Sequence, residues 1–311
     1  MINRSQTAAP LTVWLLTDLK PGHKNQLQGL IDCLQQYISI DAHWVSVIDH
    51  PIRLRDWVLG REPVADLPPP QWVIGAGHAT HIPLLICGRI YGAKTVVLMG
   101  PSLPMAWFNA CVIPQHDNPP LKSNVLVTLG VLNTMVPQVE ARVQNQGLIL
   151  IGGVNKHFHW HDSDVAEQVK HICQRQPQVQ WVLTNSRRTP DRFWSQIKAM
   201  ALSNLELVPY SETPSGWVKQ KLEQSSQVWV SRDSVSMVFE SITAGAATGL
   251  LSLPAIKSTR VVKSMEQVLE HGWAQDYNGW DMNTPLPYNS KALWEAQRAA
   301  KWLIDRLVVT Q

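Results

Sequence analysis

The chain of 311 residues is short of charge, because Asp, Glu, Lys and Arg make up only 16% of it, against about 25% in an average soluble domain. The 27 Lys and Arg residues nearly balance the 24 Asp and Glu residues, so the formal net charge is +3. The lack of basic runs excludes a dedicated nucleic-acid-binding protein, and a hydrophobic content of 45% excludes a disordered tail protein. The chain is long enough to bury a large core, and its length favours two domains.

Cysteine is scarce and scattered. The 4 Cys residues form no Cys-x-x-Cys pair and no spacing that suits zinc, so we expect buried free thiols in an intracellular protein. The polar N-terminus lacks the apolar core of a signal peptide, and no apolar run approaches the roughly 20 residues that span a bilayer. These absences predict a cytoplasmic protein, at most peripheral at the inner face of the cytoplasmic membrane.

Three common site motifs are also missing. The sequence has neither a G-x-x-x-x-G-K-[ST] P-loop nor a G-x-G-x-x-G fingerprint, which disfavours ordinary NAD binding. It has no G-x-S-x-G elbow of the kind that carries the nucleophile in α/β-hydrolases. The conspicuous excess is 14 Trp residues. We expect them mainly in the core, with contact to a membrane-surface acceptor as the alternative.

Strand-like and helix-like segments alternate through most of the chain. Short apolar runs predict strands over residues 11–17, 42–48, 72–75, 94–99, 111–113, 125–128, 148–151, 180–184, 205–208, 228–231 and 249–253, the last of them ending the series. Helical spacing predicts helices over residues 26–37, 82–91, 162–174, 190–201, 237–243 and 291–308. Asp162 is expected to cap the third of these helices with its carboxylate.

Repeated βα units predict parallel sheets covered on both faces. Two such series, each opening on a turn loop, predict an α/β fold of two Rossmann-like domains that face a cleft. We expect an N-terminal domain over residues 1–140, a C-terminal domain over 141–290 and a final helix over 291–311.

Ligands of open α/β sheets bind beyond the carboxyl ends of the strands, which directs attention to the loops there. The stretch 17–26, T-D-L-K-P-G-H-K-N-Q, puts cations and amides at a helix N-terminus, where phosphate or a hydroxylated acceptor is favoured. The loops 75–81 and 115–119 add histidines and an aspartate. The candidate acceptor-binding residues are Lys20, Asn25, Gln26, His78, His116 and Asp117. The alternative is a set of plain turns, with Asn25 capping a helix.

Three loops of the second half are typical of an anion site. The di-glycine stretch 152–157 follows a buried strand, the stretch 184–190 carries paired arginines, and the stretch 231–245 places hydroxyls at a helix N-terminus. The candidate nucleotide-sugar-binding residues are Gly152, Gly153, Asn155, Arg187, Arg188, Asp233, Ser234, Ser236 and Glu240. The alternatives are surface arginines and a capping or surface glutamate.

Alternating histidines at positions 157, 159 and 161 raise the question of a metal site. Apart from Asp162, no carboxylate or thiol frames them at ligand spacing. We therefore expect no metal.

The order of the motifs KPGHxNQ at 20–26, PxHD at 114–117, IGG at 151–153, SRRTP at 186–190 and DSVSM at 233–237 resembles the ELM (elongated mitochondria) family, named for plant mitochondrial fission factors. The second half is also similar to GT-B glycosyltransferases, notably around residues 234–254. The stretch GHAT at 77–80 departs from the basic stretch of ELM relatives, which weakens an anion site there.

The resemblance implies a GT-B-like glycosyltransferase that moves a sugar from a nucleotide-sugar donor to a cell-envelope glycan or glycolipid, with no other cofactor. It also implies a last helix that crosses back onto the first domain. Because an imidazole titrates near neutral pH, His23 is the candidate general base, with Asp18 and His78 in reserve. The alternatives are a non-enzymatic interaction protein at a membrane surface and a nucleoside-diphosphate-sugar epimerase, which we expect to need bound NAD.

Overall fold

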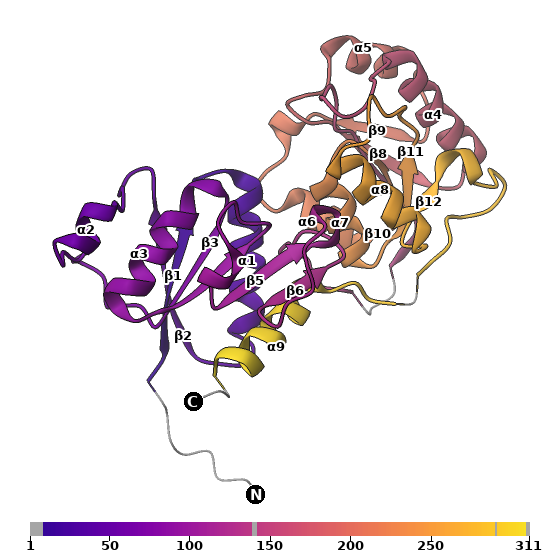
Figure 1. Cartoon of the computed structure of the whole chain (residues 1–311). Coiled ribbons are helices and arrows are strands. Elements are labelled where there is room, and N and C mark those ends of the chain that lie inside the picture. The colour runs from indigo at the N-terminus through magenta and orange to yellow at the C-terminus, as the bar shows by residue number, and fades with distance from the viewer. Residues whose placement is uncertain (1–8, 139–141, 290, 309–311) are drawn as a thin grey trace, which may run out of the picture. The chain divides into compact units, whose positions relative to one another are not determined.

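The computed structural model describes residues 9–138, 142–289 and 291–308 and divides into two compact units (Figure 1). The first unit comprises Met1–Thr134 and Glu295–Gln311, and the second comprises Met135–Trp294. Each unit contains one six-stranded sheet in which every paired strand runs parallel to its neighbour. The predicted class, α/β with two Rossmann-like halves, is confirmed.

The sheet of the first unit has the strand order β2-β1-β3-β4-β5-β6. Its strands are β1 (Leu11–Thr17), β2 (Ile40–Ser46), β3 (Trp72–Ala76), β4 (Lys94–Leu98), β5 (Ala110–Pro114) and β6 (Val125–Thr128). Its helices are α1 (Pro21–Leu34), α2 (Leu54–Val58), α3 (His81–Tyr91) and α9 (Glu295–Leu307), with short 3-10 turns η1 (His78–Thr80), η2 (Met105–Trp107) and η3 (Gln115–Asp117).

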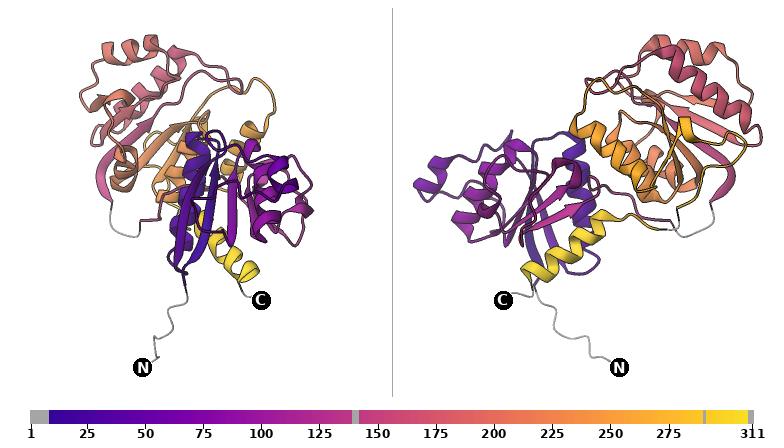
Figure 2. Two further views of the ribbon diagram at one scale, coloured as in Figure 1. Left: turned by 90° about the vertical axis from the view of Figure 1, so that its left-hand side faces the viewer. Right: turned by 45° about the vertical axis from the view of Figure 1, so that its right-hand side comes forward.

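The helices of the first unit cover both faces of its sheet. α1 and α9 pack together on one face, and α3 lies on the other with α2 beside it (Figure 2). The guanidinium of Arg298 donates to the carbonyl of Val127, and that of Arg306 donates to the carbonyls of Asn109 and Ser123. The last helix is thus attached to strands of the first unit, although about 160 residues of the second unit separate them in sequence.

The sheet of the second unit has the order β12-β11-β10-β7-β8-β9. Its strands are β7 (Val143–Leu150), β8 (Gln180–Thr184), β9 (Leu205–Val208), β10 (Ser225–Ser231), β11 (Ala247–Leu251) and β12 (Gln275–Asp276). Its helices are α4 (Asp162–Arg175), α5 (Asp191–Ala199), α6 (Trp217–Gln224), α7 (Val235–Ala244) and α8 (Arg260–Glu270), with 3-10 turns η4 (Tyr210–Glu212) and η5 (Tyr277–Gly279). α4 packs with α5, and α7 packs with α6 and α8.

Tryptophan side chains fill the second sheet by lying over glycines of neighbouring strands. Trp181 is paired in register with Gly147, and Trp229 with Gly249. A Cβ atom added to either glycine would lie within 2.5 Å of the indole. Both indoles are fully buried, so the strands can approach because glycine has no side chain.

Arg142 ties the beginning of the second unit to two of its helices. Its guanidinium donates to the carbonyls of Leu222 and Ser225 at the end of α6, and to that of Ala244 at the end of α7. The last carbonyls of a helix have no partner within the helix. One cation therefore caps two helix C-termini, where the helix dipole favours positive charge.

Three expectations about local structure are wrong. α1 begins at Pro21, five residues before its predicted start at 26, because proline at the first helical position has its φ already set for a helix. Asp162 does not cap α4; its carboxylate accepts from the Trp160 indole and from Arg192 instead. The series of strands does not end at β11, since the two-residue strand β12 pairs beside it.

The four cysteines are buried and form no disulfide with one another, as predicted. Burial raises the pKa of Cys87, Cys111 and Cys173 to about 12, so these thiols are inert core residues. Within the described ranges, no helix is both long and apolar enough to cross a membrane.

Candidate functional site

Each sheet has a point at which the chain reverses its direction of progress across the strands. In the first unit this point lies between β1 and β3, and in the second it lies between β7 and β10. Ligands of open parallel sheets bind at such switch points, beyond the carboxyl ends of the two strands. The residues that follow Thr17, Ala76, Leu150 and Ser231 are therefore the first candidates.

Asp18 and His23 meet at the switch point of the first unit. Asp18 follows β1, and α1 carries His23 in its first turn, so that the Asp18 Oδ1 atom lies 2.8 Å from His23 Nδ1. Gly77, which follows β3 with a φ of 94°, lies against this pair. A Cβ atom at Gly77 would lie 2.4 Å from His23 Nδ1, so only glycine fits.

The carboxylate fixes the imidazole and leaves one of its nitrogens open. The Asp18 side chain is 4% exposed and that of His23 18% exposed. Within the described chain, His23 Nε2 makes no hydrogen bond to protein. Burial alone would raise the pKa of Asp18, but hydrogen bonds from His23 and Lys20 outweigh it and lower that pKa. Asp18 is thus an anion that orients the His23 imidazole.

The other residues predicted in the loop 17–26 make contacts within the protein. Lys20 Nζ lies 3.2 Å from Asp18 Oδ2. Asn25 does not cap α1, since it lies in the helix and its Oδ1 accepts from Thr134 Oγ1. Gln26 is buried, and its amide faces Met99 Sδ and the Gly22 carbonyl. Of the predicted acceptor-binding residues of this loop, Lys20 alone is exposed.

His78 belongs to a second cluster, at the ends of β3 and β4. The Ser102 hydroxyl lies 3.0 Å from His78 Nδ1 and 3.2 Å from His81 Nδ1. Burial, and secondarily His78, lower the pKa of His81, so His81 is neutral at pH 7. A hydroxyl between two imidazoles is a route for a proton between them.

His116 and Asp117 lie in η3, directly after β5. Asp117 Oδ2 accepts from the Gly100 amide at 3.3 Å, which links the loops after β4 and β5. Leu19, Met99 and Asn118 follow β1, β4 and β5 with φ angles of 65°, 72° and 53°. Left-handed non-glycine residues are costly and collect at functional sites, so this edge of the sheet carries strain at three of its loops.

In the second unit, hydrogen bonds to the side chains of Ser231 and Asp233 hold the di-glycine loop. The Gly152 amide donates to Ser231 Oγ at 2.7 Å, and the Gly153 amide donates to Asp233 Oδ2 at 3.1 Å. A Cβ atom at Gly152 would lie 2.2 Å from Asp233 Oδ2. Both amides therefore already have partners within the protein, and a diphosphate cradle built on them stays a prediction.

Asp233 is a buried support of this loop and not an exposed donor contact. Its side chain is 0% exposed and lies 2.8 Å from Arg188 Nη1. Burial raises the pKa of Asp233, while Ser231, Arg188 and the Gly153 amide oppose that rise. The Ser186 and Thr189 hydroxyls also donate to the Gly152 carbonyl, so the stretch 186–189 and the di-glycine loop form one rigid unit.

Donors for an anion remain at the start of α7. Ser234 lies at the N-cap position of α7 without a side-chain cap, so the first-turn amides have no partner from the capping side chain. Ser236 is exposed in that turn, and Glu240 lies one turn further along the helix. Arg187 is exposed and makes no hydrogen bond or ion pair to another described residue. Uncapped amides together with an exposed guanidinium favour an anion.

Asn155 and His157 make hydrogen bonds that stabilise the loop in which they lie. Asn155 Oδ1 accepts from the amides of His157 and Phe158, and its Nδ2 donates to the Gly153 carbonyl. This is a side-chain turn, so the predicted contact of Asn155 with a donor is not supported. His157 Nδ1 lies 3.0 Å from Thr259 Oγ1. No group of three metal-ligating side chains is found in the described part of the chain.

Residues 21–307 match the family described as "Mitochondrial fission ELM1". The match spans nearly the whole chain and both units. The chain belongs to the mitochondrial fission ELM1 family. An uncharacterized protein of Rickettsia prowazekii (strain Madrid E), RP120, is 22% identical over 94% of this chain and 97% of its own length.

Solved structures share the two-unit fold of this ELM1-family chain at low sequence identity. A Listeria monocytogenes protein described as a UDP-N-acetylglucosamine 2-epimerase has a TM-score of 0.58 and 11% identity, over 97% of this chain and 98% of that one. UDP-GlcNAc 2-epimerase from Neisseria meningitidis bound to UDP-GlcNAc has a TM-score of 0.50 and 10% identity, over 96% and 100%. Proteins named as epimerases thus share this fold.

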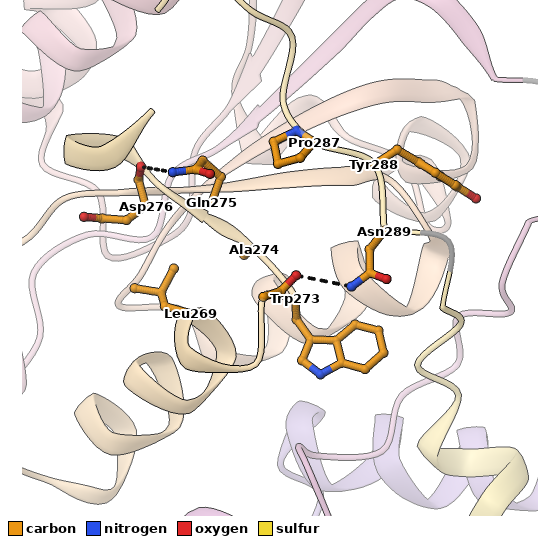
Figure 3. A pocket seen from close by; sticks show the side chains of 9 residues that line it. Leu269, Trp273, Ala274, Gln275, Asp276, Pro287, Tyr288 and Asn289 are labelled. Carbon is orange, nitrogen blue, oxygen red and sulfur yellow. Dashed lines mark hydrogen bonds between the residues drawn. The ribbon is translucent and has the colours of Figure 1, made fainter. Parts of the chain in front are cut away.

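A cavity of about 520 Å³ in the second unit of the ELM1-family chain is a weaker candidate. It lies beside β12 and is lined by Trp273, Asp276, Tyr288 and Asn289 among others (Figure 3). Asn289 donates to the Gly272 carbonyl, and Asp276 forms an ion pair with Arg232. Two of its polar side chains are therefore engaged within the fold.

Sequence reasoning missed Ser102, His81, Ser186, Thr189 and Ser231. Ser186 and Thr189 flank the paired arginines within SRRT, and Ser102 follows β4 in Gly-Pro-Ser. Polar residues directly after a buried strand were the available signal. Their partners lie far along the chain, so pairing needed the structure.

Proposed function

We propose that this protein transfers a sugar from a nucleotide-sugar donor to a hydroxyl of a cell-envelope glycan or glycolipid. The observation that carries the proposal is the Asp18–His23 pair at the switch point of the first sheet. A carboxylate-oriented imidazole with one open nitrogen is what general-base catalysis requires. The low exposure of the two side chains, 4% for Asp18 and 18% for His23, favours this role over a surface ion pair.

The first unit would activate the acceptor. His23 Nε2 takes the proton of the acceptor hydroxyl while that oxygen forms a bond to the anomeric carbon and the bond from this carbon to the diphosphate oxygen breaks. The proton ends on His23, whose Nδ1–H donates to Asp18, and the nucleoside diphosphate leaves with the electron pair. Such a single displacement inverts the anomeric centre. His78, His116 and Asp117 lie at the ends of β3 and β5 and would contact the acceptor.

The second unit would hold the donor. The uncapped amides of α7, the Ser234 and Ser236 hydroxyls and Arg187 would bind the diphosphate and stabilise the charge that develops on it. Glu240 would accept hydrogen bonds from the ribose or the donor sugar. Gly152, Gly153 and Asp233 would shape the loop, and Arg188 would reach the phosphate at the cost of its contact with Asp233. The nucleotide sugar serves as co-substrate, with no resident cofactor.

The donor class is supported by the fold. Structures of this fold include one bound to UDP-GlcNAc and one with UDP, so UDP-GlcNAc is the first donor to test. A glycolipid acceptor would place the protein in the cytoplasm at the inner face of the membrane.

The test is a thermal-shift panel of UDP-, GDP-, CMP- and ADP-linked sugars, followed by a transfer assay with the donor that stabilises the protein. We expect one donor class to raise Tm in the wild-type protein and in His23→Gln, but not in Ser236→Ala combined with Arg187→Ala. Transfer should be lost in both. His43→Gln is the matched control, because His43 and Asp41 form a similar pair at 2.9 Å on β2.

Two outcomes would assign another function. Conversion of the donor sugar at C2 without acceptor would make the protein an epimerase. No stabilisation by any donor would leave a non-enzymatic interaction protein on this fold.

A further inference from the structure

The short helix α2 presents apolar side chains to solvent. None of its residues is buried. Leu54 and Val58 are 58% and 70% exposed, and Leu59, which follows, is 57% exposed. Adjoining apolar side chains on a surface mark a contact site, whereas single ones are ordinary.

A groove of about 690 Å³ lies beside α2 on the first unit. Trp57 of α2 and Trp107 of η2 both line it, and these indoles are 48% and 59% exposed. The two come from segments 50 residues apart, while Trp14, Trp181 and Trp229 are fully buried. We call it the Trp57–Trp107 groove. Exposed indoles with an apolar body and a polar N–H suit the boundary between lipid and water.

The charged side chains that line the groove are positive. Arg89 and Lys94 are among the described residues that line it, and no carboxylate is. Arg53 and Arg55 flank the exposed leucine of α2. The Asp56 carboxylate accepts from the Arg53 amide at 2.7 Å and lies 3.8 Å from Arg55 Nε, so it offsets part of the positive charge of α2. Apolar surface combined with cations fits an anionic amphiphile.

We propose that the Trp57–Trp107 groove docks the protein onto a membrane surface that contains anionic phospholipid. Arg89 and Lys94 bind headgroup phosphates, the two indoles lie at headgroup level, and Leu54, Val58 and Leu59 enter the acyl boundary. The inference is independent of the proposed sugar transfer, since it rests on a different surface and on no donor or acceptor.

The experiment is co-sedimentation of the full chain with two kinds of vesicle. One is pure phosphatidylcholine and the other is an equal mixture of phosphatidylcholine and phosphatidylglycerol. We expect binding to the mixed vesicles alone, weakened by salt. Arg89→Ala and Lys94→Ala should each weaken the partition roughly fivefold, since one basic residue near such a surface contributes about that factor. Trp57→Ser combined with Trp107→Ser should abolish it.

Leu121→Ser is the matched control. Leu121 is 92% exposed and does not line the groove, so its variant should bind like the wild-type protein. Circular dichroism and Tm check that every variant is folded, and single tryptophan variants replace the double one if it is not. Three results would overturn the proposal: no binding to either vesicle, equal binding to both, or groove variants that bind like Leu121→Ser. Docking of another protein at the groove would then be the remaining use of this surface.

Discussion

The two units place different chemistry at equivalent points of similar sheets. In the first, the order β2-β1-β3-β4-β5-β6 leaves an imidazole with an open nitrogen between the ends of β1 and β3. In the second, the order β12-β11-β10-β7-β8-β9 leaves a loop whose amides, hydroxyls and buried carboxylate bind one another. The first arrangement is suited to move a proton, whereas the second is suited to hold a rigid shape beside a helix N-terminus. Polar residues at the end of a strand therefore need not be ligand contacts.

The largest expected effect comes from replacing His23, the proposed base of the first unit. His23→Gln should lower kcat by roughly 10²- to 10⁴-fold, the usual contribution of a general base, with donor affinity unchanged. Steady-state kinetics and donor titration measure the two quantities, with His43→Gln as control. An equal loss in both variants, or a loss of donor affinity in His23→Gln, would contradict the division of roles.

We expect alanine to be tolerated at Gly22 of the first unit and not at Gly152 of the second. Gly152→Ala places a Cβ atom 2.2 Å from a buried carboxylate oxygen, and we expect it to destabilise the protein by about 1–3 kcal/mol, as overpacking does. A Cβ atom at Gly22 meets nothing within 4 Å, so Gly22→Ala in α1 should be neutral or stabilising. Denaturant unfolding of both variants measures the contrast. Similar stabilities would mean that the loop around Asp233 moves at little cost to make room for the added Cβ atom.

The two aspartates should give opposite dependences of stability on pH. The pKa of Asp18 is lowered in the folded state, so its contribution is present above the unfolded pKa and is lost as pH falls. The pKa of Asp233 is raised by burial, so its contribution is present below the unfolded pKa and is lost as pH rises through the folded pKa.

Asp18→Asn and Asp233→Asn remove these contributions one at a time. Relative to the wild-type protein, Asp18→Asn should become less harmful to stability as pH is lowered from about 7 to about 3, and Asp233→Asn more harmful. Urea unfolding at a series of pH values measures both trends. Trends of the same sign would show that one carboxylate has been assigned the wrong environment.

The smallest expected effects are those of replacing Arg187 or Arg188, and the two replacements should differ in their effect on Tm. Arg187 has no partner among the described residues, so Arg187→Ala should weaken donor binding roughly tenfold without changing Tm, as loss of one charged hydrogen bond does. Arg188→Ala should lower Tm as well, because Arg188 pairs with Asp233. Arg175→Ala, at the exposed end of α4, is the control. Equal effects of Arg187→Ala and Arg188→Ala on Tm would remove the distinction.

Strands with clear apolar runs could be predicted to the residue. β1, β6, β8 and β9 have the predicted bounds, because each run is apolar and ends at a turn signal. The helices α2, α6 and α8 were not predicted. α2 has only 5 residues, too few for a periodic pattern to stand out, and α6 is short and largely polar.

The candidate site was predictable in its residue types and less so in their roles. His23 beside Asp18 could be expected from the loop, since the two are close in sequence. Asp233 could not be distinguished from an exposed ligand, because its burial depends on Gly153 and Arg188, which are far away along the chain. The order of the strands in each sheet could not be predicted from the sequence either, and this order decides which loops meet at a switch point.

The position of Arg142 has a consequence for the candidate anion site at the start of α7. It binds the C-terminal carbonyl of α7, while the opposite end of that helix carries Ser234 and Ser236. A helix of 10 residues is a stiff rod of about 15 Å. The Arg142 guanidinium therefore lies at the negative end of this helix dipole, and an anion bound by the first-turn amides would lie at its positive end.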